Sequence, residues 1–166
     1  MISHDEIKRA LFDPDGWCID INVAEQITKA GSIGIIDFIA SSWTLELALG
    51  SNGKEFTLAD LPNVFDLETA TLHTMWKGTG ISNYLQAFFI WNTPGQVFCE
   101  LTFNPKDMNP AQFEITEFLQ FLSKLKNAAG SDEYYVRYEN ASWKHRDAGN
   151  TSRVIFSHET FVLPNG

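Results

Sequence analysis

Residues 84–91 read YLQAFFIW, and after the turn Asn-Thr-Pro-Gly at 92–95 residues 97–103 read VFCELTF. The first segment is apolar at nearly every position, which predicts a central β-strand buried on both faces. The second alternates between core-type and mixed side chains, as in a strand with one covered face. Strands that meet at so short a turn argue against a doubly wound parallel sheet, because parallel pairs need long crossovers.

Further strands are predicted on both sides of this pair. Residues 43–49 and 69–77 alternate between apolar and polar side chains, which is the period of a half-buried strand. Asn52-Gly53 is the strongest two-residue hairpin signal, so residues 54–58 are predicted to return along 43–49. The other predicted strands are 17–23, 133–139 and 153–161.

Two helices are expected to cover the sheet. Asn109 is predicted to cap the first of them, with Pro110 at its first position and Gly130 just past its end. Its apolar stripe comprises Ile115, Phe118, Leu119, Leu122 and Leu125. Asn22 is predicted to cap the second helix, which runs to about Ser41. The expected fold class is α+β: a mostly antiparallel sheet of six to eight strands with two main helices packed on one face.

The bulk composition is that of one folded domain. The chain has 166 residues, of which 44% are hydrophobic and 13% aromatic. At this length a folded chain buries about 70% of the surface that its unfolded form exposes, so a core can carry the fold. Neither a linker nor a repeat divides the sequence, and we expect a single globular α+β domain over residues 1–166.

The charge of the chain favours a basic protein partner. The formal net charge is −9 and the pI about 4.8, a field that repels nucleic-acid phosphates and anionic membranes. We therefore expect neither nucleic acid nor membrane as partner. Binding residues concentrate on loops that a rigid sheet displays. The acids on predicted turns and connections, which we take as partner-binding candidates, are Asp13, Asp15, Asp60, Asp66 and Glu68.

The start of the chain and its cysteines indicate a cytoplasmic protein. Residues 1–6, MISHDE, contain neither the basic nor the apolar region of a secretory signal. The longest apolar run is far shorter than the ~20 residues of a membrane span. Cys18 and Cys99 both lie in apolar, strand-like segments, as expected for two free thiols in a reducing compartment.

Each catalytic or metal-binding motif that the sequence partly matches lacks a required residue. Asp13-Pro-Asp-Gly16 begins like a calcium loop but has Cys18 where the loop needs glycine, so it predicts a tight turn. The four histidines lack zinc-ligand spacing with a cysteine or a second histidine. Since we find no nucleophile elbow or phosphate loop either, we expect no catalytic residue, no cofactor and no metal.

Two alternatives remain open from the residues alone. A small-molecule-binding domain, or an enzyme without a familiar motif, could use an apolar pocket. The aromatic residues available for such a pocket are Trp43, Trp76, Phe88, Trp91 and Trp143. The second alternative is a structural or regulatory interaction protein of another kind. A local basic cluster among aromatic residues is a pattern of nucleic-acid binding, but acids interleave with it and a cross-strand mix of charges explains it better. This cluster comprises Arg137, Lys144, Arg146 and Arg153.

The layout resembles that of small acidic immunity proteins of bacterial polymorphic-toxin systems. A strand containing Asp15, Gly16, Cys18 and Asp20 leads into a helix. The segment FCELTFNP at 98–105 precedes an amphipathic helix, and the aromatic strand YYVRY at 134–138 follows. The resemblance implies a non-catalytic protein that binds and blocks a cognate toxin. It also implies carboxylates that face the basic active site of a nuclease, in keeping with the charge.

Overall fold

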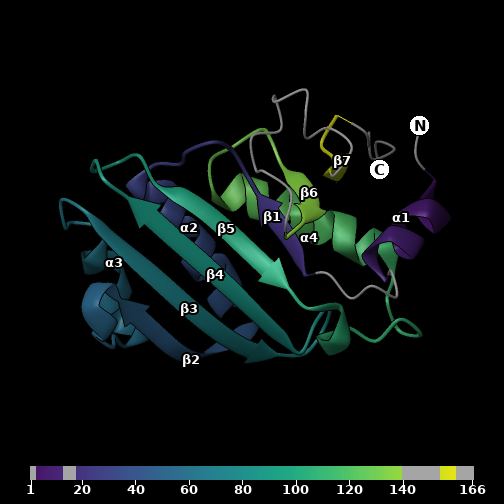
Figure 1. Cartoon of the computed structure of the whole chain (residues 1–166), viewed down its shortest axis with the longest axis horizontal. Coiled ribbons are helices and arrows are strands. Elements are labelled where there is room, and N and C mark those ends of the chain that lie inside the picture. Colours follow the sequence, from purple (N-terminus) through teal and green to yellow (C-terminus); the bar gives the residue numbers. More distant parts are fainter. Residues whose placement is uncertain (1–2, 13–17, 140–153, 160–166) are drawn as a thin grey trace.

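The structure is a computed structural model of the chain. It describes residues 3–12, 18–139 and 154–159. Its described residues form a seven-stranded antiparallel sheet of order β2-β3-β4-β5-β1-β6-β7 (Figure 1). The strands are β1 (Ile19–Asn22), β2 (Trp43–Gly50), β3 (Ala70–Gly78), β4 (Tyr84–Trp91), β5 (Phe98–Phe103), β6 (Tyr135–Tyr138) and β7 (Val154–Ser157). The predicted α+β class with an antiparallel sheet is thereby confirmed.

The centre of the sheet is a meander of β3, β4 and β5. Residues of β4 pair with both neighbours, so that Phe88 lies between His73 of β3 and Glu100 of β5. Along β4 buried and exposed side chains alternate strictly, and every second residue faces away from the core. The prediction that 84–91 is buried on both faces is therefore wrong: the strand is central, but only one face of it is covered.

Helices α2 (Lys29–Ala40) and α4 (Ile115–Ala128) cover the same face of the sheet (Figure 1). The stripe predicted for α4 is confirmed, since Phe118, Leu122 and Leu125 are fully buried. Phe118 and Phe121 contact Phe103 of β5 edge to face, at ring-centroid distances of 6.5 and 5.7 Å. Arrangements of this kind add about 0.5–1.5 kcal/mol per pair to the hydrophobic stabilisation.

The two smaller helices lie at the sides of the sheet. Helix α1 (His4–Leu11) buries Ile7 and Leu11 and begins with a capping box between Ser3 and Glu6. Helix α3 (Leu61–Val64) belongs to the connection between β2 and β3, beside the edge strand β2 (Figure 1). Within the described part of the chain, no helix has the length and apolar character needed to cross a membrane.

Three local predictions are corrected. Residues 54–58 form no second hairpin strand: after a 3-10 turn at Ser51–Gly53 a single bridge joins Leu49 and Glu55, and β3 takes the place beside β2. Asn22 ends β1 instead of capping a helix, and Thr28 caps α2. The turn at Asn109 precedes α4, which begins only at Ile115.

Glycines let α2 approach α4 closely. A Cβ atom on Gly31 would lie 2.4 Å from the carbonyl oxygen of Ala129, and one on Gly34 only 2.1 Å from that of Ala128. Real Cβ atoms do not come so close to a backbone oxygen, so any side chain would push the helices apart. The helix propensity that each glycine sacrifices, about 1 kcal/mol relative to Ala, is the cost of this contact.

Gly34→Ala is expected to lower the free energy of unfolding by about 1–3 kcal/mol, because the overpacking outweighs the gain in helix propensity. Urea unfolding followed by circular dichroism measures it. Asp37→Ala, at an exposed position of the same helix, is the control and should change little. A Gly34→Ala protein as stable as the wild type would contradict this packing.

Candidate functional site

The described acidic candidates all come from the connection between β2 and β3. Asp60 is exposed and caps the 3-10 turn Leu58–Asp60 of this connection, since its Oδ2 accepts hydrogen bonds from the Thr57 backbone N–H (3.3 Å) and hydroxyl (2.8 Å). Asp66 is exposed and pairs with Lys29 of α2. Glu68 is also exposed. Asp13 and Asp15 lie outside the described residues, so three of the five predicted acids are described, and these three share one connection.

A surface hollow of about 620 Å³ lies between this connection and the ends of β2 and β3. Of the three acids only Asp60 lines it, together with apolar groups such as Val64 and Leu67. At its rim the Lys54 ammonium lies 5.1 Å from the centroid of the Phe56 ring. The hollow therefore combines an apolar floor with charges of both signs.

The sheet face opposite α2 and α4 is rich in apolar side chains. Tyr84, Phe88 and Ile90 are 40%, 37% and 37% exposed, although they belong to a central strand. The ring of His73 stacks on Phe88 at 4.5 Å, and its Nε2 lies 2.8 Å from Oε1 of Gln86. The solvent face of an antiparallel sheet is normally polar. Exposed aromatic and apolar residues are instead typical of the core of a protein–protein interface.

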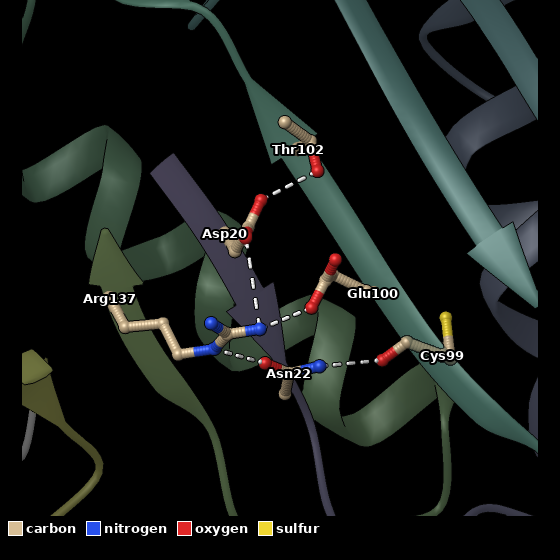
Figure 2. A network of polar contacts seen from close by, with 6 residues as sticks. All are labelled: Asp20, Asn22, Cys99, Glu100, Thr102 and Arg137. Atoms are coloured by element: carbon tan, nitrogen blue, oxygen red, sulfur yellow. Dashed lines mark hydrogen bonds and ion pairs between the residues drawn. The ribbon is translucent and has the colours of Figure 1, made fainter. Parts of the chain in front are cut away.

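A buried polar network joins β1, β5 and β6 on this same side of the sheet (Figure 2). Arg137 donates from Nε to Oδ1 of Asn22 (2.9 Å) and from Nη2 to Glu100. Asn22 in turn donates from Nδ2 to the Cys99 carbonyl (3.0 Å). Asp20 accepts a 2.7 Å bond from the Thr102 hydroxyl, and its Oδ2 lies 3.7 Å from Nη2 of Arg137.

Two carboxylates compete for one guanidinium in this network. Asp20 is 2% exposed and Arg137 3% exposed, so neither charge is well hydrated. Burial, with repulsion from Glu100, raises the pKa of Asp20 to about 6, and the Thr102 hydrogen bond and Arg137 only partly oppose this. A perturbed carboxyl is a general marker of functional sites, but here each group is satisfied by protein partners, which suits a structural role.

Sequence reasoning missed this network because its members were given other roles. Asn22 was predicted to cap a helix, and Arg137 was placed in a basic cluster whose remaining members, Lys144, Arg146 and Arg153, lie outside the described residues. The pattern that could have indicated the network is the alternation of the polar residues Asp20 and Asn22 with Ile19 and Ile21. Their side of β1 is buried as well.

The aromatic candidates for a pocket do not converge. Trp43, Trp76 and Trp91 are buried in the core, and their indole N–H groups donate to Ser82, Thr74 and Leu67 respectively. Phe88 lies on the opposite, exposed face, and Trp143 is outside the described residues. The four candidates within the described residues therefore form no common lining.

Both cysteines are free thiols. Burial raises the pKa of Cys99 strongly, and burial together with Glu139 raises that of Cys18, so neither is an activated nucleophile. Over residues 3–12, 18–139 and 154–159, no three His, Cys, Asp or Glu side chains are grouped to hold a metal ion.

Comparison with solved structures shows a known fold. The chain is similar to a chain in the crystal structure of the toxic C-terminal tip of CdiA from Pseudomonas aeruginosa in complex with immune protein. The TM-score is 0.61 at 13% sequence identity, covering 88% of this chain and 97% of that chain. At this identity the match establishes a shared fold. No protein-family model and no curated protein matches the chain.

Asp20→Asn is expected to change how stability depends on pH. Because the folded-state pKa of Asp20 is raised from 3.8 to about 6, its favourable contribution is complete below pH 3.8 and is lost as the pH rises through 6. Relative to wild type, Asp20→Asn should thus gain about 1–3 kcal/mol of stability between pH 4 and pH 7. Urea unfolding at several pH values measures the difference. Parallel stability curves for the two proteins would contradict the raised pKa.

Proposed function

We propose that this chain is an immunity-type inhibitor, a non-catalytic single domain over residues 1–166 that binds a toxin domain and blocks it. The observation that carries the proposal is the fold shared with a chain of the CdiA toxin tip and immune protein complex, over nearly the whole of both chains. Function resides in sites and not in folds, so the surfaces of this chain must also suit a protein partner. Its apolar sheet face does so.

The proposed partner is basic. The net charge of −9 makes long-range attraction to a basic toxin the natural route to fast association. Asp60, Asp66 and Glu68 are exposed on one connection, where they can steer such a partner. Exposed charges of this kind act on the association rate more than on the strength of the final complex.

The described residues also favour binding over catalysis. Both thiols have raised pKa values, so they are mostly protonated near neutral pH. Arg137 and Asp20, the buried charged pair, are satisfied within the sheet. We therefore assign no catalytic residue.

The proposal is tested by an affinity pull-down from the native organism at low salt. A single basic protein, encoded beside this chain and eluted by about 0.5 M salt, is the expected result, because the screening length then shortens to a few Å. Absence of any retained protein at low salt would refute the proposed function.

The hollow favours small-molecule binding as a second candidate function, since its volume lies within the 300–1,000 Å³ typical of ligand pockets. A thermal-shift screen with metabolites tests this candidate. Stabilisation of the wild type that is lost in a Leu67→Asp variant would place the ligand in the hollow.

The combined variant Asp60→Asn, Asp66→Asn and Glu68→Gln is expected to slow association with the partner several-fold at low salt and not at high salt. Asparagine at position 60 keeps an oxygen for the Thr57 hydrogen bonds, so only charge is removed. Stopped-flow or interferometry gives the association rate.

A matched control neutralises three exposed acids elsewhere on the chain: Glu25, Glu117 and Asp132. This control should slow association less, although the net charge changes equally. Equal slowing by both variants would show that total charge steers the partner and would contradict the assignment to the β2–β3 connection.

A further inference from the structure

The exposed side of β4 forms one surface with its neighbours, in which apolar and polar side chains are mixed. Directly paired residues of an antiparallel sheet project to the same face. One row therefore runs Leu49, His73, Phe88 and Glu100, and the next runs Leu47, Met75, Gln86 and Thr102. A third row contains Thr71, Ile90 and Phe98. We define this set as the open face.

The open face is rigid before anything binds to it. Strand β4 is hydrogen-bonded along both edges, to β3 and to β5, which fixes its backbone. The stacking of His73 on Phe88 and the polar contact of His73 with Gln86 hold the side chains at its centre. Since little ordering is required on binding, such side chains suit the anchors of an interface.

The geometry determines how a partner can dock. Because both edges of β4 are already paired, no strand can be added there, and contact must be made by side chains. Strand spacing and rise give the open face dimensions of roughly 20 by 15 Å. A standard interface buries roughly 800 Å² on each partner, so the open face supplies its core and neighbouring residues supply the rim.

The acidic connection runs close to one end of the open face. The Thr69 hydroxyl donates to the Trp91 carbonyl (3.1 Å), which places residue 68 next to the end of β4 that carries Ile90. Glu68 therefore lies near this end of the sheet, and Glu100, which is ion-paired with Arg137, lies in the central row of the open face. A second copy of this chain would bring like charges together, and phosphate-bearing partners are repelled too. A basic protein surface is complementary.

We propose that the open face, centred on Phe88 and Ile90, anchors the toxin partner through an apolar patch of that partner that is bordered by lysine or arginine. This inference rests on the proposed function and adds to it the surface of contact. Anchors act mainly on the dissociation rate and the acids on the association rate, so the two contributions are separable.

The test measures binding kinetics with the basic protein recovered in the pull-down. Phe88→Thr and Ile90→Thr are the variants, because threonine retains strand preference while removing apolar surface. Each should raise the dissociation rate at least tenfold and leave the association rate within about twofold. Ile33→Thr, on α2 at the opposite face of the sheet, should leave both rates unchanged. Circular dichroism of each variant confirms folding.

The outcomes separate the two proposals. If the wild type retains the partner but neither Phe88→Thr nor Ile90→Thr changes the dissociation rate by more than twofold, the open face is not the anchor and the proposed function stands. If the wild type retains no partner, the proposed function fails and the open face loses its occupant with it. Sedimentation of the free wild type as a dimer, disrupted by Phe88→Thr, would likewise overturn the proposal in favour of self-association.

Discussion

The close contact between α2 and α4 governs the arrangement of the remaining structure. Gly31 and Gly34 bring the α2 backbone against the end of α4, so both helices fit over a single face of the sheet. The core then consists of the residues of the central strands that point toward these helices. Every other residue of β3, β4 and β5 must point away from them. The composition of that second face is consequently not set by packing against the two helices.

The buried polar network fixes the other half of the sheet. Strand β1 lies between β5 and β6, far from both in sequence, and its pairing has to be specified by side chains. A slip of one residue would turn Asp20 and Asn22 toward the apolar side and leave Arg137 without these partners. Buried ion pairs contribute little net stability, but a buried charge that loses its partner is strongly destabilising. In this protein the network therefore favours the observed register of β1 over a shifted one. The cost is the unfavourable burial of the Asp20 carboxylate.

The periodicity of apolar residues and the turn motifs predicted most helices and strands well. They predicted the contacts between distant segments poorly. The alternation in 43–49, 69–77 and 97–103 and the stripe of α4 record local burial, and these elements are present. The prediction that β4 is buried on both faces was wrong because Phe88 and Ile90 are apolar although they are exposed. The hairpin predicted at Asn52-Gly53 is absent because β2 pairs along its length with β3 and not with residues 54–58. The pairing of Arg137 with Asp20 joins segments 117 positions apart, which periodicity cannot reveal. For the candidate site, Asp60, Asp66 and Glu68 are exposed and their role in partner binding stays a prediction, whereas the open face was not foreseen.

The most direct test of the central claim is a growth measurement. Cells that express the toxin domain encoded beside this chain are followed with and without co-expression of the chain itself. We predict that the toxin arrests growth and that the wild-type chain restores it. Arrest that persists although the chain is expressed and folded would contradict an inhibitory role.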